Sequence, residues 1–374
     1  MATRKKTTTK KEKSFLPDAS MQFFRNYINN ASPVGFETWG QKLWLDYLKP
    51  YVDTHYVDPY GTAVGVINPD HPFRVVIEAH ADEISWFVNY ITADGLIYLK
   101  RNGGVDHQTA PASRVFIHGK KGPVKAVFGW PAIHTRIGNA DQKEQSPRVD
   151  NLWLDCGARS KKEVQALGIH IGAVVTYQDG FDELANGNLI GRAFDNRIGG
   201  FMIAEVARLL KENKKKLPFG LYVVNAVQEE IGLRGAEMIA RRIKPHVAIV
   251  TDVTHDTTIP MISKNIEGDV ATGKGPSLSY APAVHNKLSA LVEEVAEKKK
   301  IPVQWRALSR STGTDTDSFA YSNDGCPSVL ISIPLRYMHT TVEMVQKEDV
   351  ENCIRLIYET LLTVKSGQDF RYLK

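Results

Sequence analysis

Seven ionisable side chains in this sequence, two histidines and five carboxylates, have the chemistry of a metal centre. They stand far apart along the chain, each beside small residues or in an apolar run: His80, Asp82, Asp195, Glu229, Glu230, Asp252 and His339. Carboxylates among apolar residues are costly to bury unless they are paired or bind a metal. Several of them together need a common positive charge, which two divalent cations would supply.

The segments that carry these residues begin like buried strands. The β-branched residues 74–77 precede His80, and residues 247–250 precede Asp252. An α/β sheet gathers its ligands at the carboxyl ends of its strands, so we expect these groups to meet at one edge. Two metal ions that share a carboxylate lie about 3.5–4 Å apart. A mixed imidazole and carboxylate set suits zinc or cobalt better than calcium or magnesium.

The chain carries the ordered segments HADE, GGVDHQ, FDNR, VQEEIGLRGA, TDVTHD, GTDTDSFA and RYMHTTVE. In these motifs the sequence closely resembles the tetrahedral (TET) aminopeptidases, a family of two-metal exopeptidases. The family includes glutamyl and deblocking aminopeptidases and proteins once labelled endoglucanase M, and the similarity runs from about Ser20 to the C-terminus. So many motifs in the same order rarely coincide by chance.

The resemblance implies a role for each residue of the candidate site. One metal would be held by His80, Asp195 and Asp252, and the other by Asp195, Glu230 and His339, so that Asp195 bridges them. Zinc or cobalt is favoured, and manganese also fits such ligands. The implied activity is release of N-terminal residues from short peptides.

The resemblance also implies that Glu229 is the general base rather than a ligand. Adjacent residues at a strand end point in different directions, so Glu229 can face the substrate while Glu230 faces a metal. Asp82 follows His80 by two residues, where it can accept the second ring N–H and fix the tautomer of that histidine.

Each residue also has a simpler structural interpretation. Asp252 alone would be an ordinary helix N-cap, and Glu229 with Glu230 would favour the N-terminal end of a helix. His80 alone would more often be a core histidine with satisfied hydrogen bonds. These interpretations are independent of one another, so their joint occurrence in the order of one family is improbable, and we favour the metal site.

Two further residues are candidates for substrate binding. Asp315 lies in GTDTDSFA, residues 313–320, a segment that the resemblance places near the substrate cleft. A loop with a helix cap explains this segment equally well. Arg336, three residues before His339, can meet a substrate carboxylate or pair with an acidic neighbour, and the sequence leaves both open.

Composition indicates a large globular enzyme. A chain of 374 residues is expected to form about two domains. The net charge of +5 arises entirely before residue 14, where six basic residues and Glu12 occur. We therefore expect a disordered basic tail over residues 1–17 and no nucleic-acid partner.

No segment approaches the roughly 20 apolar residues of a membrane span, and three scattered cysteines favour the cytoplasm.

The alternation of predicted helices and strands, interrupted by a run of short strands and turns, indicates an α/β fold with an inserted β segment. Residues 85–184 read as short strands and turns, a small β-barrel or sandwich that the resemblance describes as a PDZ-like assembly domain. Residues 18–84 and 185–374 read as a three-layer α/β/α peptidase domain. Its predicted helices are 198–213, 233–242, 284–299 and 350–364, and its predicted buried strands are 221–227, 247–250, 303–306 and 328–333.

The family resemblance also implies a quaternary structure, and two rival functions must be weighed against the aminopeptidase. The resemblance implies dimers that assemble into a homododecamer with inward-facing sites. A glycoside hydrolase is the first rival, because paired carboxylates can act as acid and base, although that reaction gives no reason for two histidines. The second rival is a non-catalytic assembly protein that has kept the fold, although this chain retains every residue of the implied site.

Overall fold

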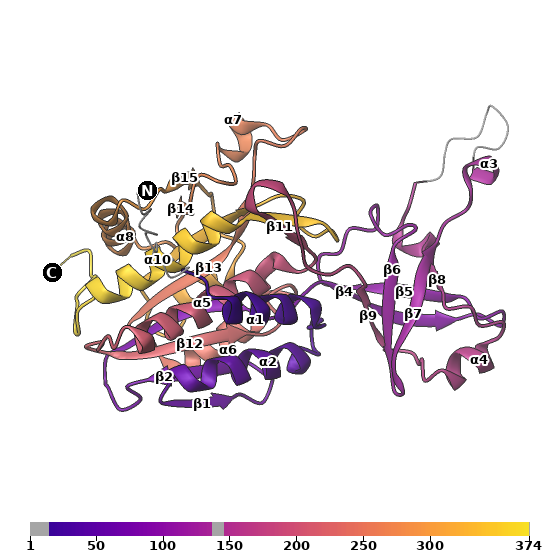
Figure 1. Cartoon of the computed structure of the whole chain (residues 1–374), viewed down its shortest axis with the longest axis horizontal. Coiled ribbons are helices and arrows are strands. Elements are labelled where there is room, and N and C mark those ends of the chain that lie inside the picture. Colours follow the sequence, from indigo (N-terminus) through magenta and orange to yellow (C-terminus); the bar gives the residue numbers. More distant parts are fainter. Residues whose placement is uncertain (1–14, 137–145, 374) are drawn as a thin grey trace, which may run out of the picture.

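The computed structural model describes residues 15–136 and 146–373, which form two bodies set side by side (Figure 1). The larger body is built on an eight-stranded sheet, and the smaller is a closed six-stranded barrel. The predicted basic tail lies almost wholly outside the described residues. Within the described ranges, no helix is long and apolar enough to cross a bilayer.

The large sheet has a parallel centre with antiparallel neighbours. Four adjacent strands, β12, β3, β13 and β16, run in the same direction. Their residues are almost all buried, as expected for parallel strands that are covered on both faces. In spatial order the strands are β1 (Thr54–Val57), β2 (Ala63–Ile67), β12 (Gly220–Ala226), β3 (Arg74–His80), β13 (Val247–His255), β16 (Ser328–Leu335), β14 (Ser277–Tyr280) and β15 (Gln304–Ala307).

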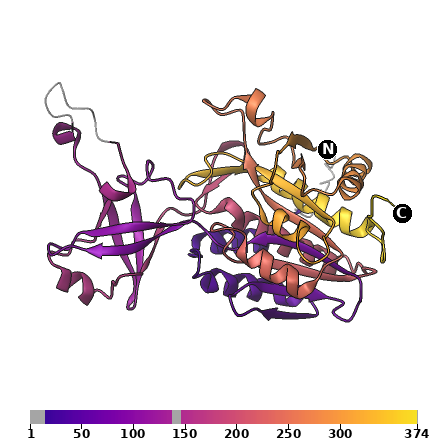
Figure 2. The same ribbon diagram turned by 180° about the vertical axis from the view of Figure 1, so that it is seen from behind.

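Helices cover both faces of this sheet and complete the three predicted layers. The long helix α5 packs on β3 and β13 with α1, α2 and α10 around it, and α8 packs against α10. On the other face, α6 and α9 pack together and against the sheet (Figure 2). The bounds are α1 (Asp18–Asn29), α2 (Thr38–Leu48), α5 (Phe194–Glu212), α6 (Arg234–Ile243), α8 (Asn286–Lys299), α9 (Asp315–Ala320) and α10 (Lys347–Thr363).

The barrel lies within the segment that the sequence predicts as an insertion. It closes through every neighbouring strand pair, so it is a barrel and not a sandwich, and it encloses its own apolar core around Trp86 and Phe128. Its strands are β4 (Ser85–Ile91), β5 (Ile97–Asn102), β8 (Trp153–Asp155), β7 (Gly122–Gly129), β6 (Arg114–Gly119) and β9 (Val174–Tyr177), and it carries the short helices α3 (Ile133–Arg136) and α4 (Lys161–Ala166).

A small third sheet connects the chain after the barrel with the C-terminal part. It pairs β11 (Asn188–Gly191) with β10 (Asp182–Glu183) and β17 (Glu343–Gln346). The register places Gly191 opposite Glu343. This pairing brings Glu343 to the start of α5. The remaining described elements are α7 (Lys264–Glu267) and single 3₁₀ turns at Lys49–Tyr51, Val149–Asn151 and Ala185–Gly187.

The predicted helices and strands of the large body are confirmed in position, with two differences. The predicted buried strand 303–306 is the edge strand β15, whose residues are not buried, because it has a neighbour on one side only. The predicted strand 247–250 continues as β13 to His255. The reason is its pairing with β16, which runs from Ala248 opposite Ser328 to His255 opposite Leu335. Asp252 therefore lies inside a strand, and the alternative of a helix N-cap at this residue is wrong.

We expect truncation of Phe201 to destabilise the large body strongly. Phe201 is fully buried on α5 and stacks on Phe24 of α1 with ring centroids 4.4 Å apart. Phe201→Ala should lower the free energy of unfolding by about 3–5 kcal/mol, because it removes buried apolar surface and leaves a cavity. Chemical denaturation followed by circular dichroism would measure this. Truncation of the exposed Tyr60 is the control and should have little effect. Equal effects would contradict this account of the core.

Candidate active site

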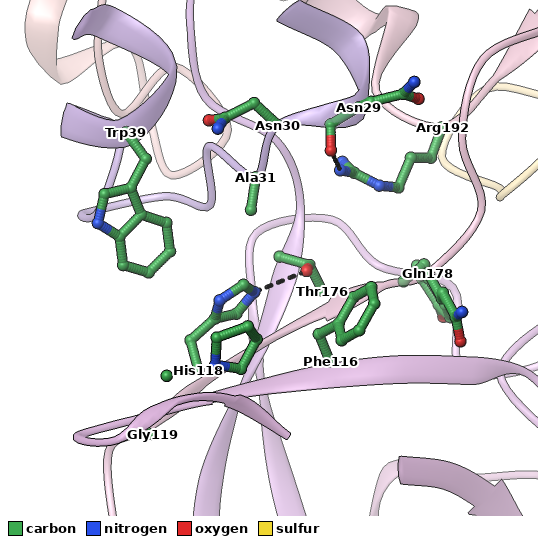
Figure 3. Close-up of a pocket in the computed structure, with 13 residues that line it drawn as sticks. Asn29, Asn30, Ala31, Trp39, Phe116, His118, Gly119, Thr176, Gln178 and Arg192 are labelled. Atoms are coloured by element: carbon green, nitrogen blue, oxygen red, sulfur yellow. Dashed lines mark hydrogen bonds between the residues drawn. The ribbon is translucent and has the colours of Figure 1, made fainter. Parts of the chain in front are cut away.

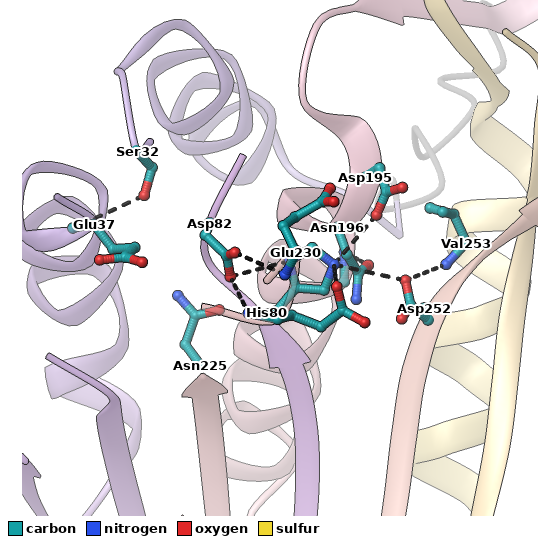
Figure 4. A network of polar contacts seen from close by, with 12 residues as sticks. Ser32, Glu37, His80, Asp82, Asp195, Asn196, Asn225, Glu230, Asp252 and Val253 are labelled. Carbon is teal, nitrogen blue, oxygen red and sulfur yellow. Dashed lines mark hydrogen bonds and ion pairs between the residues drawn. The ribbon is translucent and has the colours of Figure 1, made fainter. Parts of the chain in front are cut away.

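The parallel strands bring four of the predicted residues to one edge of the large sheet, and Figure 4 labels His80, Glu230 and Asp252 among them. His80 is the last residue of β3, and it lies in register with Ala226 at the end of β12. The turn after β12 carries Glu229 and Glu230, and Asp252 lies near the end of β13. The remaining two predicted ligands come from the start of α5, which carries Asp195, and from the loop after β16, which carries His339.

The side chains form two adjoining groups. Candidate ligand atoms of His80, Glu229 and Asp252 lie within 4.8 Å of one another, and so do those of Asp195, Glu230 and His339.

Asp195 joins the groups, because its Oδ1 lies 3.2 Å from His80 Nε2 and its Oδ2 lies 3.3 Å from His339 Nε2. His339 Nε2 also lies 3.3 Å from Glu230 Oε1. One carboxylate thus faces both histidines.

Asp82 lies beside His80 and also holds the turn after β12, although His80 Nδ1 makes no hydrogen bond within the described residues. Its Oδ1 lies 3.4 Å from His80 Nδ1, on the ring edge opposite Asp195. Its two oxygens also accept the backbone N–H groups of Glu229 and Glu230, at 3.0 and 3.1 Å. A single buried carboxylate therefore ties the histidine at the end of β3 to the turn that carries both glutamates.

Glu343 is a functional residue that the sequence reasoning missed. Its carboxylate is buried and accepts the backbone N–H of His339 at 2.8 Å and that of Asp195 at 3.1 Å. It thereby fixes the main chain at two residues of the second group. Its position within RYMHTTVE, four residues after His339, was the available signal.

The backbone carbonyl of Gly104 contacts the ring of His339 at Nδ1, the nitrogen that does not face Asp195 and Glu230. Its carbonyl oxygen lies 3.0 Å from His339 Nδ1, which suits a ring that donates from Nδ1 and presents Nε2 to the carboxylates. A Cβ atom on Gly104 would lie 2.7 Å from His339 Cε1, too close for any side chain. The GGVDHQ segment therefore contributes a close approach that only glycine permits.

Burial and mutual repulsion govern the ionisation of this cluster. Burial raises the pKa of Asp252 to about 7, and the Asp195 carboxylate adds to this. Burial likewise raises the pKa of Glu229 and of Glu230. For His339, burial acts to lower the pKa, but hydrogen bonds to Asp195 and Glu230 outweigh it and raise it to about 12. Two histidines supply too little positive charge to balance the four carboxylates of the cluster.

This donor set fits two divalent cations. Four carboxylates and two imidazoles converge with no lysine or arginine among them in the described chain. Buried like charges of this kind need a compensating cation, and mixed nitrogen and oxygen donors are those of zinc and related metals. The alternative in which Glu229 and Glu230 open a helix is wrong, because α6 begins only at Arg234.

A cavity of about 310 Å³ opens beside the cluster. His80, Asp195 and Glu229 are among the residues that line it, together with Thr314 from the GTDTDSFA segment. Asp315 itself is buried away from this lining, beside the fully buried Glu78. The loop therefore reaches the cavity, but through Thr312, Gly313 and Thr314.

Arg336 also lies outside the cavity lining. Its Nε donates to Asp256 Oδ2 at 2.7 Å, and its Nη2 donates to the Thr258 hydroxyl at 3.2 Å. This arrangement corresponds to pairing with an acidic neighbour, one of the two interpretations that the sequence left open.

A larger cavity, about 490 Å³, lies where the barrel meets the large body (Figure 3). Its walls include Trp39, Phe116 and His118, and the His118 ring lies 2.9 Å from the Thr176 hydroxyl. Arg192 borders it, but that guanidinium is paired with Glu83. No carboxylate belongs to its lining among the described residues, so the smaller cavity is the candidate active site.

Metal binding at this site should release protons. The carboxyl group of Asp252 is half protonated near pH 7, and the imidazole of His339 carries its proton to higher pH. Both must lose a proton to bind a cation. Metal affinity should therefore fall as the pH is lowered, by roughly tenfold per pH unit for the proton on His339 and, below about pH 7, by a further tenfold per unit for the proton on Asp252. Calorimetry in two buffers of different ionisation enthalpy would count these protons. A pH-independent affinity would contradict this ionisation scheme.

Comparison with known proteins gives relatives along nearly the whole chain. A lysyl aminopeptidase of Pyrococcus furiosus is 32% identical over 354 residues, 93% of this chain and 98% of the relative. The TET aminopeptidase of a marine sediment archaeon of the Thaumarchaeota superposes with a TM-score of 0.88 at 30% identity, covering 93% of this chain and 98% of that one.

A second similar structure supports the fold alone. The TET1 peptidase of Pyrococcus horikoshii, described as able to assemble into a tetrahedron or a large octahedral shell, gives a TM-score of 0.79 at 23% identity. The two chains are covered to 91% and 98%. The model of the M42 glutamyl aminopeptidase family matches residues 61–356, and this chain therefore belongs to that family of metal-dependent aminopeptidases.

Proposed function

We propose that this enzyme is a two-metal aminopeptidase whose ligands are His80, Asp195, Glu230, Asp252 and His339. The observation that carries the assignment is Asp195, whose two oxygens face two different histidines at 3.2 and 3.3 Å. A carboxylate in that position can bridge two cations. Zinc or cobalt suits the donor set best, and manganese is compatible with it.

Glu229 is proposed as the general base. Two bound cations would acidify a water molecule and polarise the scissile carbonyl. The Glu229 carboxylate borders the cavity, 3.8 Å from His80 Nε2, while its backbone is held by Asp82. It is thus fixed where it can accept a proton from water and return it to the leaving amine. Burial raises its pKa in the metal-free protein, and two bound cations would lower it again, which would leave the carboxylate ionised and able to act as a base.

Short peptides are the proposed substrates. The cavity is small, and the loop that carries Thr312, Gly313 and Thr314 forms part of its wall. A space of this size suits one residue on the N-terminal side of the cleaved bond, with the remaining peptide directed outward. Family membership and this size together support release of single N-terminal residues.

We expect Glu229→Gln to abolish turnover without abolishing metal binding. The amide keeps the size of the side chain but cannot act as a base, so kcat should fall by about 10²–10⁴. Release of the first residue from unblocked peptides would be measured after chelation and return of zinc, cobalt or manganese.

Two further variants distinguish loss of the general base from general damage to the protein. Asp195→Asn should lose both metals, and Glu237→Gln, on the exposed face of α6, should behave as wild type. Full activity of Glu229→Gln would exclude Glu229 as the base.

We also propose that the chain self-associates in the cytoplasm, with the barrel contributing contacts towards a homododecamer. Large apolar side chains on the barrel are exposed: Tyr90, Val127, Ile133, Leu167 and Ile171. Such surface commonly marks an interface. The cysteines Cys156, Cys326 and Cys353 are free thiols, which suits a reducing compartment. Analytical ultracentrifugation should show an assembly larger than a dimer, and a monomer at all concentrations would contradict this.

A further inference from the structure

The barrel reaches the metal cluster through a turn of two glycines. Strand β5 ends at Asn102, and Gly103 and Gly104 follow it directly. A Cβ atom on Gly103 would lie 3.3 Å from Cβ of Glu230, and the carbonyl oxygen of Gly104 lies 3.0 Å from Nδ1 of His339. Gly103 also has a φ of +91°, which glycine adopts without strain. The main chain of this turn therefore contacts two proposed ligands of the same metal.

Asn102 attaches the start of this turn to the large body. Its side chain is buried, and Nδ2 donates to the Val34 carbonyl oxygen at 2.9 Å and to Ser85 Oγ at 2.8 Å. Because a backbone carbonyl can only accept, the amide nitrogen rather than the amide oxygen must face Val34. Ser85 lies opposite Asn102 in the pairing of β4 with β5, so that bond stays within the barrel. The bond to Val34 crosses from the barrel to the large body.

Val34 is itself tied to the segment that carries His80. Its backbone N–H donates to the carbonyl oxygen of Glu83 at 3.2 Å, and Glu83 follows His80 closely in the HADE motif. One path of hydrogen bonds thus runs from the end of β3 through Val34 and Asn102 to the turn that contacts His339. This path links the segments that position the two histidines of the cluster.

Other contacts also hold the barrel against the large body. The ring centroids of Phe36 and Phe87 lie 6.2 Å apart, and those of Trp39 and His118 lie 4.9 Å apart. Phe87 and His118 belong to the barrel strands β4 and β6, whereas Phe36 and Trp39 belong to the large body. Loss of the Asn102 side chain should therefore leave the barrel attached while it releases the two-glycine turn.

We propose, on the basis of the two-metal function above, that Asn102 is a positioning residue for the metal site. It fixes the two-glycine turn against Glu230 and His339, and thereby sets the direction in which His339 presents Nε2. The barrel is then a structural part of the metal site, in addition to any part that it has in self-association. Asn102 contacts neither metal nor substrate in this scheme, and its effect reaches the metal through the turn and the His339 ring.

The test titrates chelated protein with zinc and resolves the binding steps by calorimetry. The wild-type chain should bind two zinc ions. Asn102→Ala should weaken one of the two steps by about tenfold and leave the other within about twofold, because groups that orient a metal-binding histidine typically contribute at least tenfold to affinity. Asn102→Ser, whose side chain is too short to reach Val34, should have the same effect and replaces the alanine variant if that variant folds poorly.

Two matched variants isolate the bond to the large body. Ser85→Ala removes only the bond within the barrel, so both zinc affinities should stay near the wild-type values. Asn188→Ala removes a different amide bond to a backbone carbonyl, that of Ala185, outside the barrel, and should also behave as wild type. Equal weakening of both steps by Asn102→Ala, no weakening of either step, or an equal loss in Ser85→Ala would each overturn the proposal.

Activity gives a second readout that general damage to the fold would not reproduce. At limiting metal, Asn102→Ala should lose turnover. Excess metal should restore kcat with KM unchanged, because the His339 ring is displaced but every proposed ligand remains. A loss of kcat that excess metal does not restore would contradict the assignment.

A crystal structure of Asn102→Ala tests the positioning without metal or turnover. The distance between the Gly104 carbonyl oxygen and His339 Nδ1, now 3.0 Å, should lengthen beyond the range of a hydrogen bond. If the wild-type chain binds fewer than two cations or cleaves no peptide, the proposed function fails, while this displacement still supports Asn102 as the residue that orients His339. An unchanged contact in the variant would overturn that role.

Discussion

The accumulation of buried negative charge at one edge of the sheet is the constraint on which this structure depends. Asp195, Glu229, Glu230 and Asp252 converge there with two histidines as the only cationic partners among the described residues. Folding a chain around such a cluster is unfavourable unless metals or protons neutralise it. Burial is the main cause that raises the pKa of Asp252 and of Glu230, and neighbouring carboxylates add to it. Hydrogen bonds to Asp195 and Glu230 raise the pKa of His339. The fold tolerates it because the parallel strands at this edge are deeply buried and rigidly paired.

The main chain around the cluster is held by residues that are not ligands in the proposed scheme. Asp82 joins the end of β3 to the turn after β12, and Glu343 joins the start of α5 to the loop after β16. Gly104, from the segment next to the barrel, fixes the ring of His339. Each of these contacts bridges two segments, so the relative positions of the two histidines are determined by a few buried hydrogen bonds. Preorganisation of this kind is what catalytic metal sites require.

The lining of the smaller cavity carries charges of both signs. It includes the carboxylate and histidine cluster, and it also includes Arg306 and Glu267. Arg306 donates to the hydroxyl of Thr254 on β13, the strand that also carries Asp252. Its own strand β15 lies at the edge of the sheet, outside the parallel centre.

The sequence by itself determined the inventory of candidate ligands, the strands and helices of the large body, and the presence of an inserted β segment. These features follow from residue type and from periodicity over a few positions, which are local properties. Only the tertiary structure decided that the insertion closes into a barrel, that Asp252 lies within a strand, and that Arg336 pairs with Asp256 outside the cavity. It also revealed the contact between Gly104 and His339, residues 235 positions apart. Such contacts depend on strand register and on the path of long connections, which no local pattern encodes.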